Sequence, residues 1–251
     1  MKREPVLSLH DPINERTWEV PERPIRSVWA DARERWLLNV SAELPVAASL
    51  VEAPFLEVEA HHGMGVLSLC LIRMDRAAPD WAPLSMGPAV TGCAVRVACR
   101  HRTTGEPCVW VATRCTDHLL GSLLPRLGFP DVAVGLQATE RGWPSCRAPW
   151  VEARVEHGIA APSRLFATST AFDDVIARGI RSYGRGPTTG TWSVIDLIKD
   201  APSTFRMHRD LVGTLELPGG CYDLDSICSC AGGRWHWDIL SPVDDAGRPL
   251  P

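Results

Sequence analysis

The sequence predicts an α+β protein that is predominantly antiparallel β, in which a barrel or cone carries one or two helices. Three observations predict this fold class. Most segments between residues 64 and 240 are short and either apolar throughout or alternating, which is typical of strands. Glycine and proline residues that favour turns separate these segments. A single segment, 170–182, has clear helical spacing, so helix is the minor component.

Composition indicates a globular chain with one main domain. Of the 251 residues, 45% are hydrophobic and 22% are charged, near the average for folded domains. Residues 1–27 are rich in proline and charge, so we expect a lead-in segment there and a single β domain over residues 28–251. The longest apolar run, Gly65–Ile72, is far shorter than the roughly 20 residues that span a bilayer, and we expect no membrane partner.

The net charge and the cysteine content indicate the cell compartment and the kinds of partner to expect. The net charge of −4 and the scattered basic residues argue against nucleic acid as a partner. The cysteines number nine, an odd count, which indicates free thiols. Residues 1–10 contain no apolar core of signal-peptide length, so we expect a cytoplasmic protein. A homo-oligomer is left open.

The apolar segment 64–74 is expected to be a central strand covered on both faces. The clearest hairpin joins strands over 90–102 and 107–115 through a turn at Thr103–Glu106. In its first strand, apolar residues from Cys93 to Cys99 share one face, and Arg96 lies on the other.

Further elements follow in the second half of the chain. Helices are expected over 118–127 and 170–182. Turns are expected at Pro218–Gly220 and Gly232–Gly233. Strands are expected over 131–140, 150–157, 191–198, 210–217, 221–230 and 235–240.

Four polar residues lie in strands of otherwise apolar or alternating character: Arg96, Arg114, Gln137 and Glu140. Polar groups that face the inside of an apolar barrel are typical of a small-molecule site. Arg96 or Arg114 could hold a carboxylate through paired hydrogen bonds. We therefore predict Arg96, Arg114 and Gln137 as ligand-binding residues and Glu140 as a proton-transfer group. The alternative is that the arginines lie on the solvated outer face.

Two groups of residues could suggest a metal. Cys228 and Cys230, with Cys221 and His236 nearby, do not have the separated ligand pairs of a zinc site. Alternation along a strand explains them as buried core residues, and the same applies to the cysteines of the hairpin. His61 and His62 are expected in an exposed turn. We therefore expect neither a metal nor a cofactor, with metal-assisted hydrolysis as a weaker alternative.

The order of several segments resembles the acetoacetate decarboxylase-like superfamily, in particular its bacterial branch called domain of unknown function 2071-like. Each segment is a weak match, and their order carries the resemblance. The segments are Phe55–Val58 leading through Gly63, the hairpin Val95–Thr113 with Gly105–Trp110 where the chain enters its second strand, Leu127–Pro130, Phe172–Tyr183 and Asp223–Trp237. The resemblance implies a barrel or cone around a small-molecule cavity.

Departures from the family pattern bear on the chemistry. In decarboxylases of this family the segment that resembles Gly128–Pro130 leads into a lysine that forms an imine with the substrate, and here Asp131 follows. The other lysines are Lys2, near the terminus, and Lys199, whose neighbours Asp196 and Asp200 are expected to raise its pKa. The resemblance also implies glutamates of the decarboxylase site on the strand before the hairpin turn, but the strand 90–102 contains no acidic residue. Acetoacetate decarboxylase activity is therefore expected to be absent.

Two functions remain open. The first is binding of a small, anionic or polar organic molecule in a barrel cavity, with any catalysis independent of lysine. The second is a structural or sensing module without a functional cavity, in which the ten tryptophans serve packing or a partner surface.

Overall fold

The structure is a computed structural model of the 251-residue chain. It describes residues 6–11, 16–21, 25–119, 121, 124, 129, 132–138, 144–178, 180–186 and 189–250.

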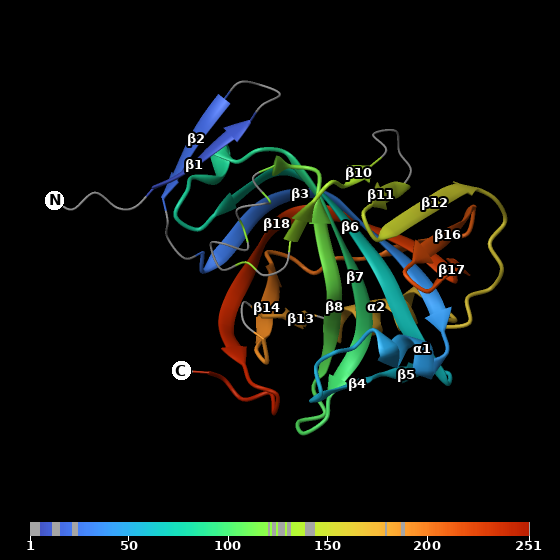
Figure 1. Cartoon of the computed structure of the whole chain (residues 1–251). Coiled ribbons are helices and arrows are strands. Elements are labelled where there is room, and N and C mark those ends of the chain that lie inside the picture. The colour runs from blue at the N-terminus through green and yellow to red at the C-terminus, as the bar shows by residue number, and fades with distance from the viewer. Residues whose placement is uncertain are drawn as a thin grey trace.

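A closed barrel of seven strands forms the body of the molecule (Figure 1). All neighbouring strands of the barrel are antiparallel except the parallel pair β13 (Arg181–Arg185) and β8 (Pro107–Thr116). The predominantly antiparallel fold class predicted from the sequence is confirmed. In order around the barrel the strands are β7 (Val90–His101), β6 (Met64–Pro79), β3 (Ser27–Ala42), β18 (Ser226–Val243), β14 (Trp192–Lys199), β13 (Arg181–Arg185) and β8 (Pro107–Thr116), which pairs again with β7.

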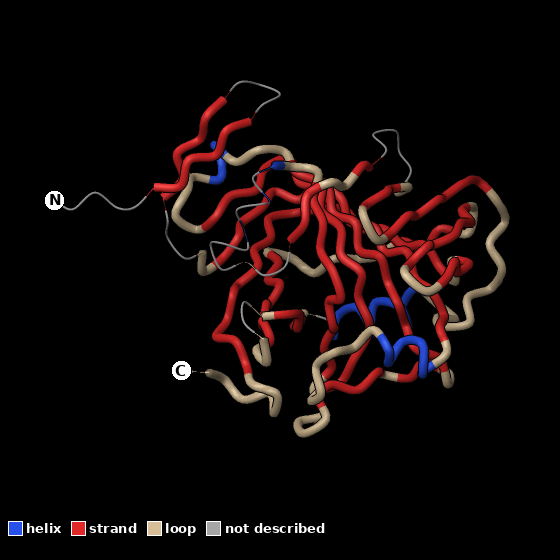
Figure 2. Tube along the Cα trace, in the orientation of Figure 1, coloured by secondary structure: helices blue, strands red, loops and turns tan. Residues whose placement is uncertain are grey.

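A second sheet of five strands lies beside the barrel (Figures 1 and 2). Its order is β10 (Gln137–Ala138), β11 (Cys146–Ala148), β12 (Val151–His157), β16 (Leu211–Leu217) and β17 (Gly220–Asp223). Short strands extend the barrel sheet: β4 (Leu56–Val58), β5 (Ala60–His61), β9 (Val132–Val134) and β15 (Arg206–His208). A separate hairpin consists of β1 (Val6–Asp11) and β2 (Arg16–Pro21).

Helix is the minor component of the described chain, which contains α1 (Leu44–Ser49), α2 (Ser169–Arg178) and the 3₁₀ turn η1 (Leu84–Met86). None of these is long and apolar enough to cross a membrane.

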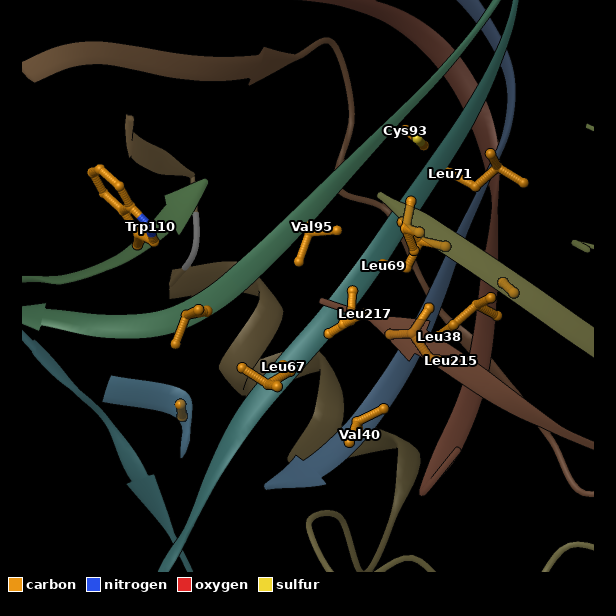
Figure 3. Close-up of a cluster of buried hydrophobic side chains, with 14 of the residues drawn as sticks. Leu38, Val40, Leu67, Leu69, Leu71, Cys93, Val95, Trp110, Leu215 and Leu217 are labelled. Atoms are coloured by element: carbon orange, nitrogen blue, oxygen red, sulfur yellow. The ribbon is translucent and has the colours of Figure 1, made fainter. Parts of the chain in front are cut away.

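The main core lies between the outer face of the barrel and the second sheet. Leu67, Leu69 and Leu71 alternate along β6 and belong to the same buried cluster as Leu215 and Leu217 of β16 (Figure 3). Full burial of each leucine contributes about 2 kcal/mol relative to exposure. The intervening residues of β6 point into the barrel because successive side chains of a strand alternate between its faces. The sequence of one strand therefore builds both the core and the cavity wall.

Most predicted elements are confirmed. The hairpin 90–102 and 107–115 corresponds to β7 and β8, and the central strand 64–74 begins β6. The strands expected over 150–157, 191–198 and 210–217 correspond to β12, β14 and β16. The helix predicted over 170–182 is α2, but it ends at Arg178 because the chain continues as β13, which pairs with β14. The helix expected over 118–127 lies largely outside the described residues.

Two predictions about the C-terminal strands are wrong. No single strand covers 221–230, since β17 ends at Asp223 and β18 begins at Ser226. Gly232–Gly233 is not a turn but lies inside the long strand β18. A β-carbon on Gly232 would lie 1.8 Å from the carbonyl oxygen of Ala32, so this glycine allows the backbones of β18 and β3 to approach closely.

Candidate functional site

A cavity of about 400 Å³ occupies the barrel. Its wall is mainly apolar, and its charged residues are arginines: Arg35, Arg96 and Arg114. No aspartate or glutamate is among the described residues that line it. Apolar lining residues include Met74, Trp81, Val111, Phe129, Leu197 and Trp237. Positive charge without an opposing carboxylate makes the cavity suited to an anion with an apolar body.

Arg96 enters the cavity from β7 because its neighbours Val95 and Val97 face the core on the other side of the strand. Only 9% of Arg96 is exposed, and its Nε–H group is buried without a hydrogen-bond partner. Burial lowers the pKa of Arg96 to about 10; the nearby Cys70 opposes this shift and Arg35 adds to it. A buried donor without an acceptor is rare in folded proteins, and the cavity that Arg96 lines has space for one.

Cys70 lies between two of these arginines on the inward face of β6. Its direct partners are Leu37 of β3 and Ala94 of β7, so Arg35 and Arg96 occupy diagonal positions on either side. Arg35 Nε–H donates a hydrogen bond to Cys70 Sγ over 3.2 Å. Burial raises the pKa of the Cys70 thiol, but Arg35, Arg96 and Lys199 together outweigh it, so the pKa is lowered.

Lys199 has the opposite environment to the one expected from its sequence neighbours. Its ammonium lies 5.3 Å from the ring centroid of Trp235 and 5.9 Å from that of Phe205. Burial first, and then the charge of Arg35, lower its pKa to about 8. The expectation of a raised pKa is wrong because Asp196 lies on the other face of β14.

The carboxylate of Asp196 is paired with Arg181, at 2.8 Å between Oδ2 and Nη2. Asp200, the other acidic neighbour of Lys199 in the sequence, is exposed. Lys199 itself is not among the described residues that line the cavity.

Arg114 lies at another part of the cavity wall, with its guanidinium carbon 5.9 Å from the ring centroid of Phe129. Gly184 makes room for it, since a β-carbon there would lie 3.1 Å from Arg114 Nη1. The indole N–H of Trp81, another lining residue, is buried and has no hydrogen-bond partner. The alternative that the two arginines lie on a solvated outer face does not hold for this structure.

The structure does not bring Gln137 to this site. The strand expected over 131–140 is split into β9, which joins the barrel sheet, and β10, which joins the second sheet. Gly135, with φ of +126°, lies at the break. Gln137 is therefore exposed in the second sheet, paired with Arg147. Glu140 and Asp131 lie outside the described residues.

The residues considered for a metal are not grouped. Within the described ranges, no cluster of three or more His, Cys, Asp or Glu side chains could hold an ion. Cys228 and Cys230 are buried, as the core interpretation predicts, and so are the four cysteines of the β7–β8 hairpin. Cys221 is exposed. His62 lies in a turn with φ of +51°.

The sequence interpretation did not identify Arg35 and Cys70. Arg35 belongs to a charged stretch that precedes the apolar cluster Trp36–Leu38. The alternation of side chains along this strand was the one available signal that Arg35 faces the cavity. Cys70 is a single cysteine in an apolar strand, where a packing role is the ordinary interpretation. Their proximity depends on the register of β3 against β6.

Comparison with solved structures identifies the fold. An acetoacetate decarboxylase structure covers 94% of this chain and 95% of its own, with 11% identity and a TM-score of 0.56. Acetoacetate decarboxylase from Legionella pneumophila subsp. pneumophila str. Philadelphia 1 has 11% identity, covers 90% of this chain and 91% of its own, and has a TM-score of 0.54.

An acetoacetate decarboxylase-like enzyme from Sphingomonas wittichii RW1 has 11% identity, covers 90% of this chain and 95% of its own, and has a TM-score of 0.50. No family model matches the sequence, and no curated protein matches it. The likeness is one of fold, and the barrel is acetoacetate decarboxylase-like.

Proposed function

We propose that this acetoacetate decarboxylase-like barrel binds a small organic carboxylate in its cavity, with the carboxylate at Arg96 and the apolar part along the surrounding wall. The observation that carries the proposal is the buried Nε–H group of Arg96, which has no partner in a cavity whose described lining contains no acid. A carboxylate would supply both the acceptor and the countercharge.

The apolar wall supports a ligand that is more than a small inorganic anion. Trp81 and Phe129 contribute rings to the lining, and Met74 adds a flexible side chain that can adapt to the ligand's shape. A cavity of about 400 Å³ lies within the range of ligand pockets in proteins. The cavity also favours this function over a module whose interior is filled.

The test compares hexanoate with hexanamide, which differ in charge and have the same chain length. Isothermal titration calorimetry of the full chain is expected to detect hexanoate and to show at least tenfold weaker binding of hexanamide, because a charged hydrogen bond is lost. Equal affinity for both compounds, or binding of neither, would contradict the proposal.

The matched variants are Arg96→Met and Arg33→Met. Arg33 is two residues from Arg35 on the same strand, but its side chain is 66% exposed and pairs with Asp75. We expect Arg96→Met to abolish hexanoate binding and Arg33→Met to retain it. Loss of binding in both variants would indicate a general effect of net charge.

We further propose that binding does not proceed through an imine. The lowered pKa of Lys199 makes this worth testing, because a neutral amine is the reactive form. Incubation with a 2-oxo acid and cyanoborohydride, followed by intact-mass measurement, is expected to leave the mass unchanged. A reduced adduct mapped to Lys199 would overturn this part of the proposal.

Membership of the bacterial domain of unknown function 2071-like branch and a role for Glu140 in proton transfer are also kept as proposals. Both rest on the sequence.

A further inference from the structure

Cys70 differs from Cys93 and Cys115, the other cysteines among the described residues that line the cavity, in the group that its sulfur contacts. Cys70 accepts a hydrogen bond from Arg35, which leaves its sulfur within a cationic environment, whereas Cys93 and Cys115 lie opposite each other in the β7–β8 pair. Cys228 belongs to the same buried cluster as Cys70 but is not among the described residues that line the cavity.

A second observation points to a ligand beside this sulfur. Arg96 lies diagonally across from Cys70 on the neighbouring strand β7. Only 9% of Arg96 is exposed, and its Nε–H group has no hydrogen-bond partner. A carboxylate bound at Arg96 would therefore lie close to the inward face of β6, which carries Cys70. The anion site of the proposed function and the thiol thus share one end of the cavity.

Charge favours the ionised form of the thiol. Arg35 and Arg96 flank Cys70, Lys199 contributes from β14, and the described lining contains no carboxylate to oppose them. The thiolate is the nucleophilic form of cysteine, and neighbouring cations are a usual cause of its formation. An anionic ligand would compete with the Cys70 thiolate for these cations. Its reactive carbon must therefore approach the sulfur while the carboxylate is held at Arg96.

We propose that Cys70 is a nucleophile of the cavity, and that the ligands of this site include carboxylates with an electrophilic carbon within two bonds of the carboxylate carbon, such as the β-carbon of α,β-unsaturated acids. This inference rests on the proposed function, because Arg96 must bind the carboxylate for the carbon to reach the sulfur. It adds a covalent step that binding alone does not require.

The step balances without an external oxidant or reductant. The Cys70 sulfur forms a bond to the β-carbon of the unsaturated acid, and the π electrons of the double bond move to the α-carbon. That carbon takes a proton from water, which replaces the proton that the thiol released on ionisation. The product is a thioether.

The probes are iodoacetate and iodoacetamide, two alkylating agents that differ in charge at the group next to the reactive carbon. With either probe, sulfur bonds to carbon and iodide leaves. The exposed thiol of Cys221 in the same molecule serves as the internal reference. Peptide mapping by mass spectrometry gives the rate of alkylation at each cysteine of the full-length protein.

We expect the iodoacetate-to-iodoacetamide rate ratio to be at least tenfold higher at Cys70 than at Cys221. Arg96→Gln is expected to bring the ratio at Cys70 to within about threefold of that at Cys221, because the directing cation is lost. Arg33→Gln, which removes an exposed arginine of the same strand as Arg35, is expected to leave the ratio unchanged. Hexanoate is expected to protect Cys70 from iodoacetate.

The outcomes separate this inference from the function on which it rests. If hexanoate binds but Cys70 shows the same ratio as Cys221, the nucleophile is excluded and carboxylate binding stands. If hexanoate does not bind and Cys70 has no preference for iodoacetate, both fail. A preference that survives in Arg96→Gln would also overturn the inference, because the carboxylate would not be held where we place it.

Discussion

Arg96 illustrates at the scale of one residue how a binding site can cost stability. Its guanidinium is buried, and among the described groups no acceptor satisfies its Nε–H. Burial of a charge is unfavourable unless hydrogen bonds and countercharge offset the loss of water. In the unliganded protein this residue is therefore a source of instability that a bound anion would relieve.

We expect Arg96→Met to raise the free energy of unfolding of the unliganded protein by about 1–3 kcal/mol, since an apolar side chain of similar length replaces an incompletely satisfied buried cation. Urea denaturation measures the change. Arg33→Met, at an exposed position, is expected to stay within about 0.5 kcal/mol of the wild type. A destabilised Arg96→Met variant would show that the guanidinium is a structural support.

Lys199 leads to a prediction about pH. Its pKa of about 8 in the folded chain lies below its ordinary value of 10.5, so the folded state binds this proton less tightly than the unfolded state. The cost of keeping Lys199 charged is fully present below pH 8 and disappears as the pH rises from about 8 to 10.5.

We therefore expect Lys199→Met to stabilise the protein by on the order of 1 kcal/mol at pH 7, with a smaller gain above pH 9, because methionine also packs well against Trp235 and Phe205. Thermal melts of both proteins between pH 6.5 and pH 10 check this. A gain that is constant across this range would show that the pKa of Lys199 is not lowered.

At the scale of an element, a bulge in the β7–β8 pair explains why both even-numbered and odd-numbered residues of β8 line the cavity. Ala94 pairs with Arg114, but Arg96 pairs with Val111, so β8 contains one extra residue between these pairs. The extra residue changes the alternation of β8, and Arg114 and Val111 consequently line the same cavity although one residue number is even and the other odd.

The two adjacent glycines of β18 provide a matched test of backbone approach. We expect Gly232→Ala to destabilise the protein by more than about 2 kcal/mol, because its β-carbon would lie 1.8 Å from Ala32 O. Gly233→Ala is expected to cost less than about 1 kcal/mol, since its nearest neighbour, Trp235 Nε1, is 3.5 Å away. Urea denaturation distinguishes them, and equal effects would argue against close packing of β18 on β3.

At the scale of the whole molecule, ligand binding should be visible as stability. A ligand that binds only the folded state at 100 times its dissociation constant adds about 2.7 kcal/mol. For a chain of this size we expect the melting temperature to rise by about 5–10 °C with saturating hexanoate. Differential scanning fluorimetry checks this, with hexanamide as the neutral control and Arg96→Met as the variant that should not respond.

Much of the fold was accessible from local pattern. The hairpin, the central strand and the late helix were predicted because each carries its own periodicity, as in the alternation from Cys93 to Cys99. The failures were of another kind. Gly232 and Gly233 are typical of a turn, and the sequence gives no information about the neighbouring backbone that makes them necessary within a strand. Gln137 was placed in the barrel because 131–140 was interpreted as one strand, although it is split at Gly135.

The sequence by itself determined the fold class, the main strands and the position of Arg96 on the strand face opposite Val95 and Val97, since these depend on side-chain alternation within one strand. Only the tertiary structure decided the site. The register of β3 on β6 brings Arg35 and Cys70 together, and the assembly of the barrel adds Lys199. Burial then lowers the pKa of Lys199, where its sequence neighbours predict a raised one. Contacts between strands and removal from water are properties of the assembled barrel, and no single segment carries them.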